Sequence, residues 1–446
     1  MWYYSRAVNR ITSNTRRFTY MKNFILKGDI AYSENKDKIK TIEQGYLVCE
    51  DGICKGAFEK LPKKYEEFPL IDCGEKLIIP GMTDLHTHAP QYACRGFAMD
   101  LELLEWLEAY AFPQEARYAS LEYADQAYDV LVKDLKKSFT TRAVFFGTLH
   151  KEATTLLMDK LEDSGIVTYV GRVSMDRNGG MNLQETSVEK SIADTRDWLQ
   201  SIEGRYNRTK PILTPRFIPS CSDKVMANLG EIAESQNVRI QSHLSENPSE
   251  IEWVKDLVPA SSCYANAYEI FGCMGSTEAP AIMAHCVYSD QAEMEIMKKH
   301  GAYVAHCADS NMNLSSGIAP ATKFLEYGLN MGLGSDIAGG TSLNMMDAII
   351  ASIKASKLYW RLIDSNSRIL TFEQAFYLAT AGGGSYFGKV GAFEDGFDFD
   401  ALVLDDSETL SPGGLSIRDR LERMCYDSGK CVVAKKFVVG QEIALG

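Results

Sequence analysis

The distribution of apolar and polar residues changes twice along the chain. Between residues 21 and 77, short β-type runs are separated by charged turns, and no long helical period is present. From residue 78 to residue 385, apolar runs alternate with amphipathic helical stretches, and from residue 386 to residue 446 the β-type pattern returns. This order predicts a central α/β unit and one small β domain that both chain ends build together.

Eight apolar runs can be counted for the central unit, at residues 77–82, 141–146, 166–173, 212–218, 238–243, 279–284, 302–307 and 329–334. Eight strands that alternate with helices over about 308 residues are typical of a (β/α)8 TIM-type barrel. A doubly wound open sheet is the competing fold, but no Gly-rich dinucleotide fingerprint follows any of the runs. We therefore predict a barrel flanked by the small β domain.

The first 20 residues differ from the rest in composition. They contain four arginines and no acidic residue, and Met21 then opens the first β-type run. An organelle transit peptide has this composition. An expression leader, or a start codon assigned too far upstream, would give the same composition. We predict that residues 1–20 are a leader outside the functional fold.

Charge and cysteine content indicate which binding partners and which cellular compartment to expect. The chain carries 47 Lys and Arg against 60 Asp and Glu, a formal charge of −13, which argues against nucleic acid as a partner. It has no run of about 18 apolar residues, so we expect no segment to span a membrane. Eleven cysteines without a CxxC pair, in a chain of this size, favour a reducing cytoplasm.

Most of the seven histidines lie at the carboxyl ends of the predicted strands, on the face that holds the active site of a barrel. His86 and His88 stand two residues apart on a strand, so both imidazoles point the same way and can share a metal ion. His243 closes the fifth run, and Asp336 follows the eighth. Three neutral nitrogens and one carboxylate suit one zinc ion per subunit with a position left for water, although iron or manganese would also fit. We predict these four residues as the metal ligands.

Two further residues near these strand ends are candidates for catalysis. His285, at the end of the sixth run, is placed to hydrogen-bond the attacking water and the oxyanion that forms from it. Glu246 lies three residues past His243 and is predicted to shuttle protons, although an acid at this point could equally begin a helix or lie on the surface. The middle runs contain no lysine that could bridge two metals, so one metal is the simpler interpretation.

The order of these motifs resembles the amidohydrolase superfamily and, within it, the guanine deaminases. The resemblance extends over nearly all of residues 21–446. It rests on Pro80-Gly-Met-Thr-Asp-Leu-His-Thr-His-Ala-Pro-Gln-Tyr, Leu103-Leu-Glu-Trp-Leu, Thr214-Pro-Arg-Phe, His243-Leu-Ser-Glu, Ala284-His-Cys, Val304-Ala-His-Cys and Gly334-Ser-Asp-Ile-Ala-Gly-Gly. It implies the same single zinc site.

The resemblance also implies a set of substrate-binding residues, Gln91, Arg216 and Phe217. Phe217 offers an apolar face on which a purine can stack. Arg216 supplies only donors and Gln91 both a donor and an acceptor, so together they can read a carbonyl and ring-nitrogen edge such as that of guanine. Core packing for Phe217 and a buried ion pair for Arg216 are the alternatives. The chain departs from the family after Val304-Ala-His-Cys, where Ala308-Asp309 replaces the usual proline.

The activity implied is hydrolytic deamination of guanine to xanthine and ammonia, a step of purine catabolism, by a homodimer. Asp336 and Glu246 would accept the proton of the attacking water, and Glu246 would pass it to the ring nitrogen beside the amino-bearing carbon. Two alternatives remain open. The chain could deaminate another aminated heterocycle, such as a pterin, a triazine or an adenine-type base, or it could be a metal-free scaffold protein.

Overall fold

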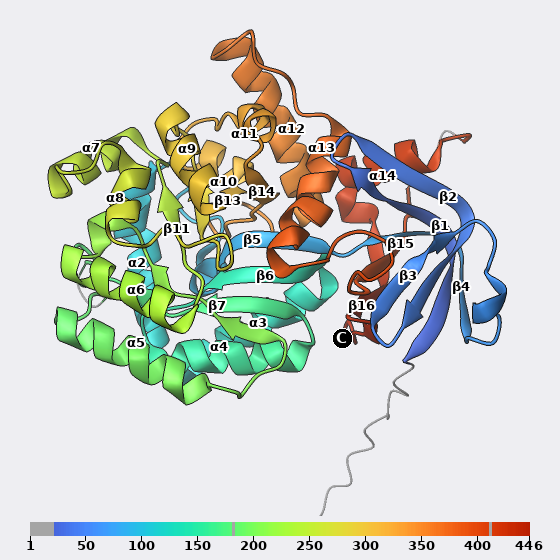
Figure 1. Ribbon diagram of the computed structural model, residues 1–446, viewed down its shortest axis with the longest axis horizontal. Helices are drawn as coiled ribbons and strands as arrows, with labels where there is room; N and C mark the ends of the chain where they lie inside the picture. The colour runs from blue at the N-terminus through green and yellow to red at the C-terminus, as the bar shows by residue number, and fades with distance from the viewer. Residues whose placement is uncertain (1–21, 181–182, 410–412) are drawn as a thin grey trace, which may run out of the picture.

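Eight parallel strands, or strand pairs, form the centre of the computed structural model (Figure 1), which describes residues 22–180, 183–409 and 413–446. The predicted leader, residues 1–20, lies outside the described residues. The barrel strands are β5 (Met82–His88), β6 (Thr140–Phe146), β7 (Val167–Gly171) continued by β8 (Val173–Ser174), β9 (Thr209–Pro211) continued by β10 (Thr214–Pro215), β11 (Gln241–Leu244), β12 (Ile282–His285), β13 (Tyr303–His306) and β14 (Asn330–Leu333).

Two parallel sheets make up this barrel. Their strand orders are β5-β6-β7-β9 and β11-β12-β13-β14, and β8 pairs with β10. A parallel bridge from Leu213 to Ile240 joins the sheets on one side. On the other side the backbone N–H of Asp336, just after β14, donates to the carbonyl of His86 in β5 at 2.8 Å. The predicted (β/α)8 barrel is confirmed, and its closing contact joins two of the predicted metal ligands.

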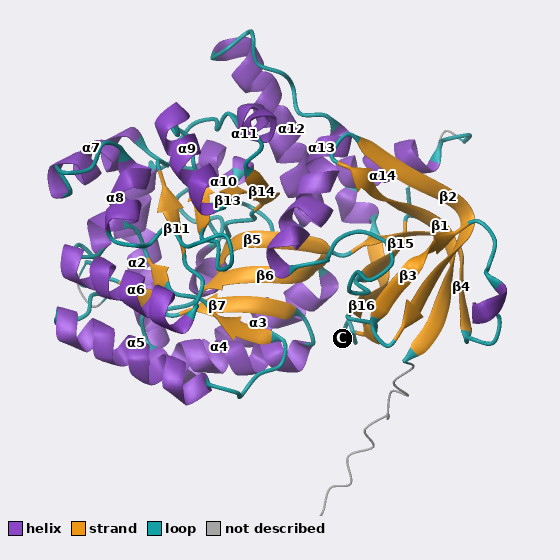
Figure 2. Ribbon diagram, viewed as in Figure 1, coloured by secondary structure: helices purple, strands orange, loops and turns teal. Residues whose placement is uncertain are grey.

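Helices surround the barrel and cover its strands (Figure 2). Side-chain caps begin several of them, as at Ser120, Ser222 and Asp290, and left-handed residues such as Gly165 and Gly301 end them. They are α3 (Leu121–Lys137), α4 (Lys151–Ser164), α5 (Val188–Ile202), α6 (Asp223–Gln236), α7 (Pro248–Leu257), α8 (Tyr264–Ile270), α9 (Gln291–His300), α10 (Ala308–Asn313), α11 (Ala321–Tyr327), α12 (Met345–Leu362) and α13 (Phe372–Tyr377). Within the described ranges, none of the helices is long and apolar enough to cross a membrane.

Both chain ends contribute to one seven-stranded sheet beside the barrel, in the order β17-β16-β15-β4-β1-β2-β3. Phe24, Phe399 and Phe437 pack against one another in its core, and α14 (Ile417–Tyr426) packs on β1 and β2. The strands are β1 (Asn23–Asn35), β2 (Lys38–Glu50), β3 (Ile53–Phe58), β4 (Leu70–Pro80), β15 (Ala401–Asp405), β16 (Val432–Val438) and β17 (Gln441–Glu442). The sheet has the composite origin predicted from the sequence.

The first barrel strand differs from the prediction. The apolar run 77–82 belongs mostly to β4, which pairs with β1 and β15 in the flanking sheet, and the first barrel strand is β5. Gly81 joins the two strands, and a Cβ atom at this position would lie 2.1 Å from Oγ1 of Thr141. One nearly continuous strand therefore leads from the flanking sheet into the barrel, which is why its apolar pattern shows no break.

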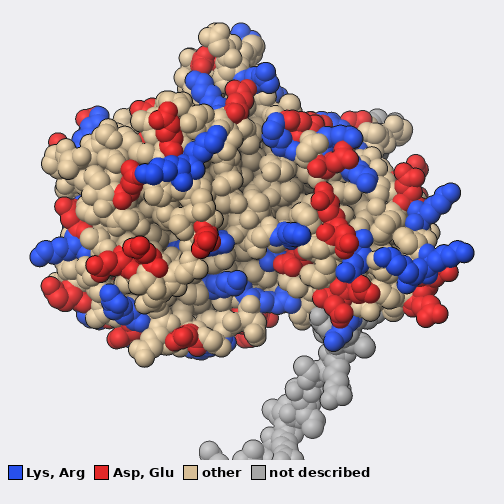
Figure 3. Space-filling model, in the orientation of Figure 1, with Lys and Arg blue, Asp and Glu red and all other residues tan. Residues whose placement is uncertain are grey.

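Buried charged groups connect the flanking sheet to the barrel. Arg142 in β6 donates from Nε to Asp400 at 2.6 Å and from Nη2 to Asp398 at 3.0 Å. Lys436 in β16 is fully buried and donates to the carbonyls of Leu135 and Thr140, both at 3.0 Å. On the outer surface, by contrast, acidic and basic side chains are interspersed over the face in Figure 3, with no large field of one sign.

Candidate active site

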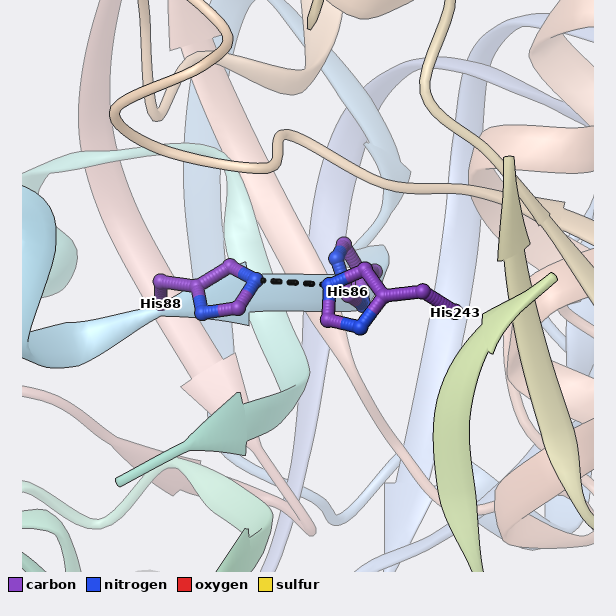
Figure 4. Close-up of side chains that lie close together, drawn as sticks. All are labelled: His86, His88 and His243. Atoms are coloured by element: carbon purple, nitrogen blue, oxygen red, sulfur yellow. Dashed lines mark hydrogen bonds between the residues drawn. The ribbon is translucent and has the colours of Figure 1, made fainter. Parts of the chain in front are cut away.

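Three histidines from two strands converge at the carboxyl end of the barrel (Figure 4). His86 and His88 lie on β5 and His243 on β11, and the Nε2 atoms of His88 and His243 are 3.2 Å apart. One nitrogen from each imidazole lies within 4.8 Å of the other two. Ligand atoms that bind a tetrahedral zinc at about 2.0–2.1 Å are themselves about 3.3 Å apart, so the spacing suits one metal ion.

Asp336 adds an anionic oxygen to this cluster. Its Oδ1 lies 3.3 Å from Nε2 of His86 and 3.5 Å from Nε2 of His88. Burial by itself would raise the pKa of Asp336, but attraction to His86 and His285 outweighs this and holds the pKa at about 2. The carboxylate is therefore ionised, and the four predicted ligands form one constellation.

The imidazoles of this cluster are in the state that binds a metal. Burial lowers the pKa of all three, so they are neutral at pH 7 and each keeps a lone pair. Nδ1 of His243 donates to the carbonyl of Arg216 at 2.6 Å, which leaves its Nε2 as the lone-pair nitrogen. Neither ring nitrogen of His86 has a hydrogen-bond partner among the described residues. An unpartnered, buried imidazole beside a carboxylate is what a metal site without its ion presents.

Glu246 and His285 lie beside the cluster. Oε2 of Glu246 is 3.4 Å from Nε2 of His285, and Ser316 donates to Oε1 of Glu246 at 3.0 Å. Burial raises the pKa of Glu246 to about 7, where a carboxyl group can both accept and release a proton near neutral pH. Glu246 is 4% exposed and the cap of α7 is formed by Asn247 and Glu250, so the surface and helix-start alternatives do not describe its position.

The three predicted substrate-binding residues line a single cavity with most of the cluster. Gln91 and Arg216 contribute polar groups to its wall. The apolar lining consists of Leu103, Trp106, Leu107, Phe217 and Leu314. The lining also includes the ionisable residues His88, His243, His285, Glu246 and Asp336. The cavity thus combines a candidate metal centre, a buried acid and an apolar lining.

Comparison with known proteins agrees with this arrangement. The model of the amidohydrolase family matches residues 77–443. The chain belongs to the amidohydrolase family. It is 35% identical over 444 residues to the guanine deaminase of Dictyostelium discoideum, an alignment that covers 94% of this chain and 98% of that protein. It is 37% identical over 372 residues to the guanine deaminase of Rattus norvegicus, with 82% of this chain and 80% of that protein covered.

A solved structure is also closely similar to this amidohydrolase. The crystal structure of guanine deaminase from C. acetobutylicum with bound guanine in the active site superposes with a TM-score of 0.91 and is 42% identical. The superposition covers 95% of this chain and 100% of that chain. The likeness therefore includes the flanking sheet as well as the barrel.

Sequence reasoning missed four polar residues that hold the site of this amidohydrolase together. Asp84 accepts hydrogen bonds from the backbone N–H groups of His86 and Ser335, and thereby ties β5 to the segment after β14. Asn311 in α10 accepts from Nδ1 of His285 at 2.8 Å. The other two are Ser316 and Glu115. Only Asp84 carried a signal in the sequence, since it lies within the first histidine motif.

The remaining histidines lie outside the cavity lining. His300 contacts Glu269 at 3.0 Å, at the end of α9. His150 precedes α4, and His306 is buried at the end of β13. The segment that departs from the family pattern, at Ala308-Asp309, forms the start of α10, the helix that carries Asn311 to the site.

Proposed function

We propose that this amidohydrolase is a guanine deaminase, which hydrolyses guanine to xanthine and ammonia. The observation that carries the proposal is that three of the four candidate metal ligands, Glu246 and the Gln91–Arg216–Phe217 wall line one cavity, and the fourth ligand, His86, lies in the same cluster. The guanine deaminases to which the chain is similar, one of them with guanine bound, support the choice of substrate.

We infer one zinc ion per subunit, held by His86, His88, His243 and Asp336. This donor set would also accept iron or manganese, because nitrogen and carboxylate ligands serve all three metals. When bound, the ion would lower the pKa of a coordinated water from 15.7 toward about 7 and so supply hydroxide at neutral pH. The complete donor set argues against a metal-free scaffold protein.

Glu246 moves the protons of the proposed reaction. It takes a proton from the attacking water and transfers it to the ring nitrogen next to the amino-bearing carbon, which makes that carbon electrophilic. Its raised pKa, about 7, lets the same carboxyl group act in both directions. His285, at 3.4 Å from Glu246, hydrogen-bonds the oxyanion of the tetrahedral intermediate. Asp336 accepts the second proton of the water, which passes to the amino group, and that group leaves as ammonia when the carbon–nitrogen bond breaks.

Gln91, Arg216 and Phe217 hold and select the purine. Phe217 stacks on the ring, and stacking of a base on an aromatic side chain contributes roughly 1–3 kcal/mol. Arg216 donates to the carbonyl oxygen and Gln91 bonds the neighbouring ring nitrogen. Arg216 also forms a buried ion pair with Glu115 at 2.6 Å. The ion pair and the proposed contact with the purine are therefore compatible roles for this arginine.

We further infer that the protein works in the cytoplasm as a homodimer in purine catabolism. All eleven cysteines are free thiols, ten of them buried, which suits a reducing compartment. The homodimer is an expectation from the family resemblance. Sedimentation analysis of the purified chain would test it, and a monomer of 49.7 kDa would contradict it.

A substrate panel tests the proposed function against a deaminase of another heterocycle. We expect ammonia release from guanine with a kcat/KM far above that for adenine, cytosine, melamine or pterin. A site that bonds a carbonyl and N–H edge can reject adenine or melamine, which lack this edge, by as much as about 10⁴-fold. Pterin presents the same edge as guanine, so its kcat/KM tests the fit of the second ring. A higher kcat/KM for any of the other four would overturn the assignment.

A further inference from the structure

Glu115 lies behind the polar wall of the cavity and contacts both of its polar members. It belongs to the short helix α2 (Phe112–Ala116) and is 1% exposed. Its Oε1 accepts a hydrogen bond from Nε2 of Gln91 at 2.9 Å, and its Oε2 accepts one from Nη1 of Arg216 at 2.6 Å. The Arg216 guanidinium also packs over the ring of Phe112, 4.8 Å from its centroid. One carboxylate thus bridges two wall residues that are 125 positions apart in the chain.

This bridge determines which way the amide of Gln91 faces. A carboxylate paired with a guanidinium accepts hydrogen bonds and donates none, so only the NH₂ group of Gln91 can face Glu115. The carbonyl oxygen of Gln91 is then the end that remains for other partners, and it lies 3.4 Å from the backbone N–H of Ala338. A carbonyl oxygen has two lone pairs, so it can accept a second hydrogen bond from a ligand in the cavity.

The same bridge fixes the guanidinium of Arg216. One of its five N–H groups is directed at Glu115, and its plane is held against Phe112. The guanidinium is planar and rigid, so its other N–H groups have fixed directions. The wall therefore offers an acceptor from Gln91 next to donors from Arg216.

We propose that Glu115 is the positioning residue that sets this acceptor-and-donor pattern and thereby the choice of purine. The pattern complements a ring N–H beside a carbonyl, as at N1 and C6 of guanine. It opposes a purine that has an unprotonated ring nitrogen and no carbonyl there, such as 2-aminopurine, because two acceptors would face each other and the donors of Arg216 would stay unpaired. The inference rests on the proposed function and names the group behind its selectivity.

The test compares guanine with 2-aminopurine in the zinc-loaded protein, wild type and Glu115→Gln. A glutamine at 115 can donate to the carbonyl of Gln91, so the amide of Gln91 is free to turn and present its NH₂ to the ligand. We expect the ratio of kcat/KM for guanine to kcat/KM for 2-aminopurine to fall by about tenfold or more, as expected when a buried polar group loses its partner. The metal content should stay at the wild-type level.

Two matched variants complete the design. Glu108→Gln removes the same charge from an exposed position of the neighbouring helical segment and should leave the ratio unchanged. Glu115→Asp keeps the charge but withdraws the carboxylate by about one bond length, so its ratio should lie between those of the wild type and Glu115→Gln. If Glu115→Gln does not fold, the ratio of the two kcat/KM values measured for Glu115→Asp tests the inference instead.

The outcomes separate this inference from the proposed function. If Glu115→Gln lowers kcat/KM for both purines in the same proportion, Glu115 only supports the fold and the inference is wrong, while guanine remains the substrate. A ratio for Glu115→Asp equal to that of the wild type, with Glu115→Gln unfolded, overturns it as well. If the wild-type protein does not deaminate guanine at all, the proposed function itself fails.

Discussion

Oε2 of Glu246 lies 3.4 Å from Nε2 of His285, and both side chains are buried at the end of neighbouring barrel strands. Their attraction raises the pKa of His285 against the effect of burial and opposes the rise in the pKa of Glu246. An acid and an imidazole whose pKa values are shifted by burial and by each other are candidates for proton transfer at an active site. Each depends on the other for its protonation state.

Replacing Glu246 by Gln should separate chemistry from binding. The variant should keep one equivalent of metal and bind guanine about as tightly as the wild type, because no candidate ligand is altered. Its kcat should fall by about 10²- to 10⁴-fold, the usual contribution of a general acid or base. Glu252→Gln, an exposed position on α7, is the control. Turnover at the wild-type level in Glu246→Gln would refute the proton-transfer role.

Replacing Phe217 by Ala should weaken guanine binding more than it slows chemistry. Loss of stacking should raise KM by roughly 5- to 150-fold, the equivalent of about 1–3 kcal/mol, with a smaller change in kcat. Steady-state kinetics at fixed zinc measure both. Phe97→Ala, at a side chain that is 58% exposed, should change neither. An unchanged KM in Phe217→Ala would mean that Phe217 serves core packing alone.

Replacing Asp400 by Ala tests the connection between the flanking sheet and the barrel. The substitution leaves the Arg142 guanidinium buried with only Asp398, which is one-third exposed. Breaking a buried ion pair from one side costs about 3–5 kcal/mol, so the free energy of unfolding should fall by that order. Asp398→Ala should cost much less because water already screens that carboxylate. Equal losses in the two variants, measured by urea denaturation, would contradict this account.

Lys436 should make stability rise with pH. Burial lowers the pKa of Lys436 from 10.5 to about 7, so between these values the unfolded chain binds more protons than the folded one. The free energy of unfolding should therefore increase from pH 7 toward pH 10, by up to about 1.4 kcal/mol per pH unit from this group. The increase is absent below about pH 7, where both states are protonated.

Comparison of Lys436→Met with the wild type isolates the contribution of Lys436 to the rise of the free energy of unfolding with pH. Denaturation at pH 7 and pH 9 should show a smaller rise in the variant than in the wild type. Lys435→Met changes a neighbouring lysine that is 37% exposed and paired with Glu442, and it should keep the wild-type rise. The same rise in Lys436→Met and the wild type would show that the buried ammonium is not its source.

Much of the fold and of the candidate metal site could be predicted because both depend on local pattern. The barrel strands are apolar runs, and the candidate ligands His86, His88, His243 and Asp336 lie on these strands or just after them. The boundary at Pro80 and Gly81 could not be placed, because one apolar stretch crosses from the flanking sheet into the barrel.

The hydrogen bonds that support the site could not be predicted from the sequence, for a different reason. Glu115 bonds Gln91 across 24 positions and Arg216 across 101, and Asp84 bonds Ser335 across 251. Such pairs meet only when the barrel and the segments that connect its strands have folded, so no spacing in the sequence marks them. An isolated acid in a helical stretch has the same appearance whether it is solvated or buried.

The most direct test of the account is xanthine formation from guanine by the purified chain before chelation, after chelation and after zinc is restored. We predict that activity is present at the start, falls to background when the metal is removed, and returns with about one equivalent of zinc per chain. Full activity in chelated protein that holds no metal would contradict the convergence of His86, His88, His243 and Asp336 on a catalytic ion.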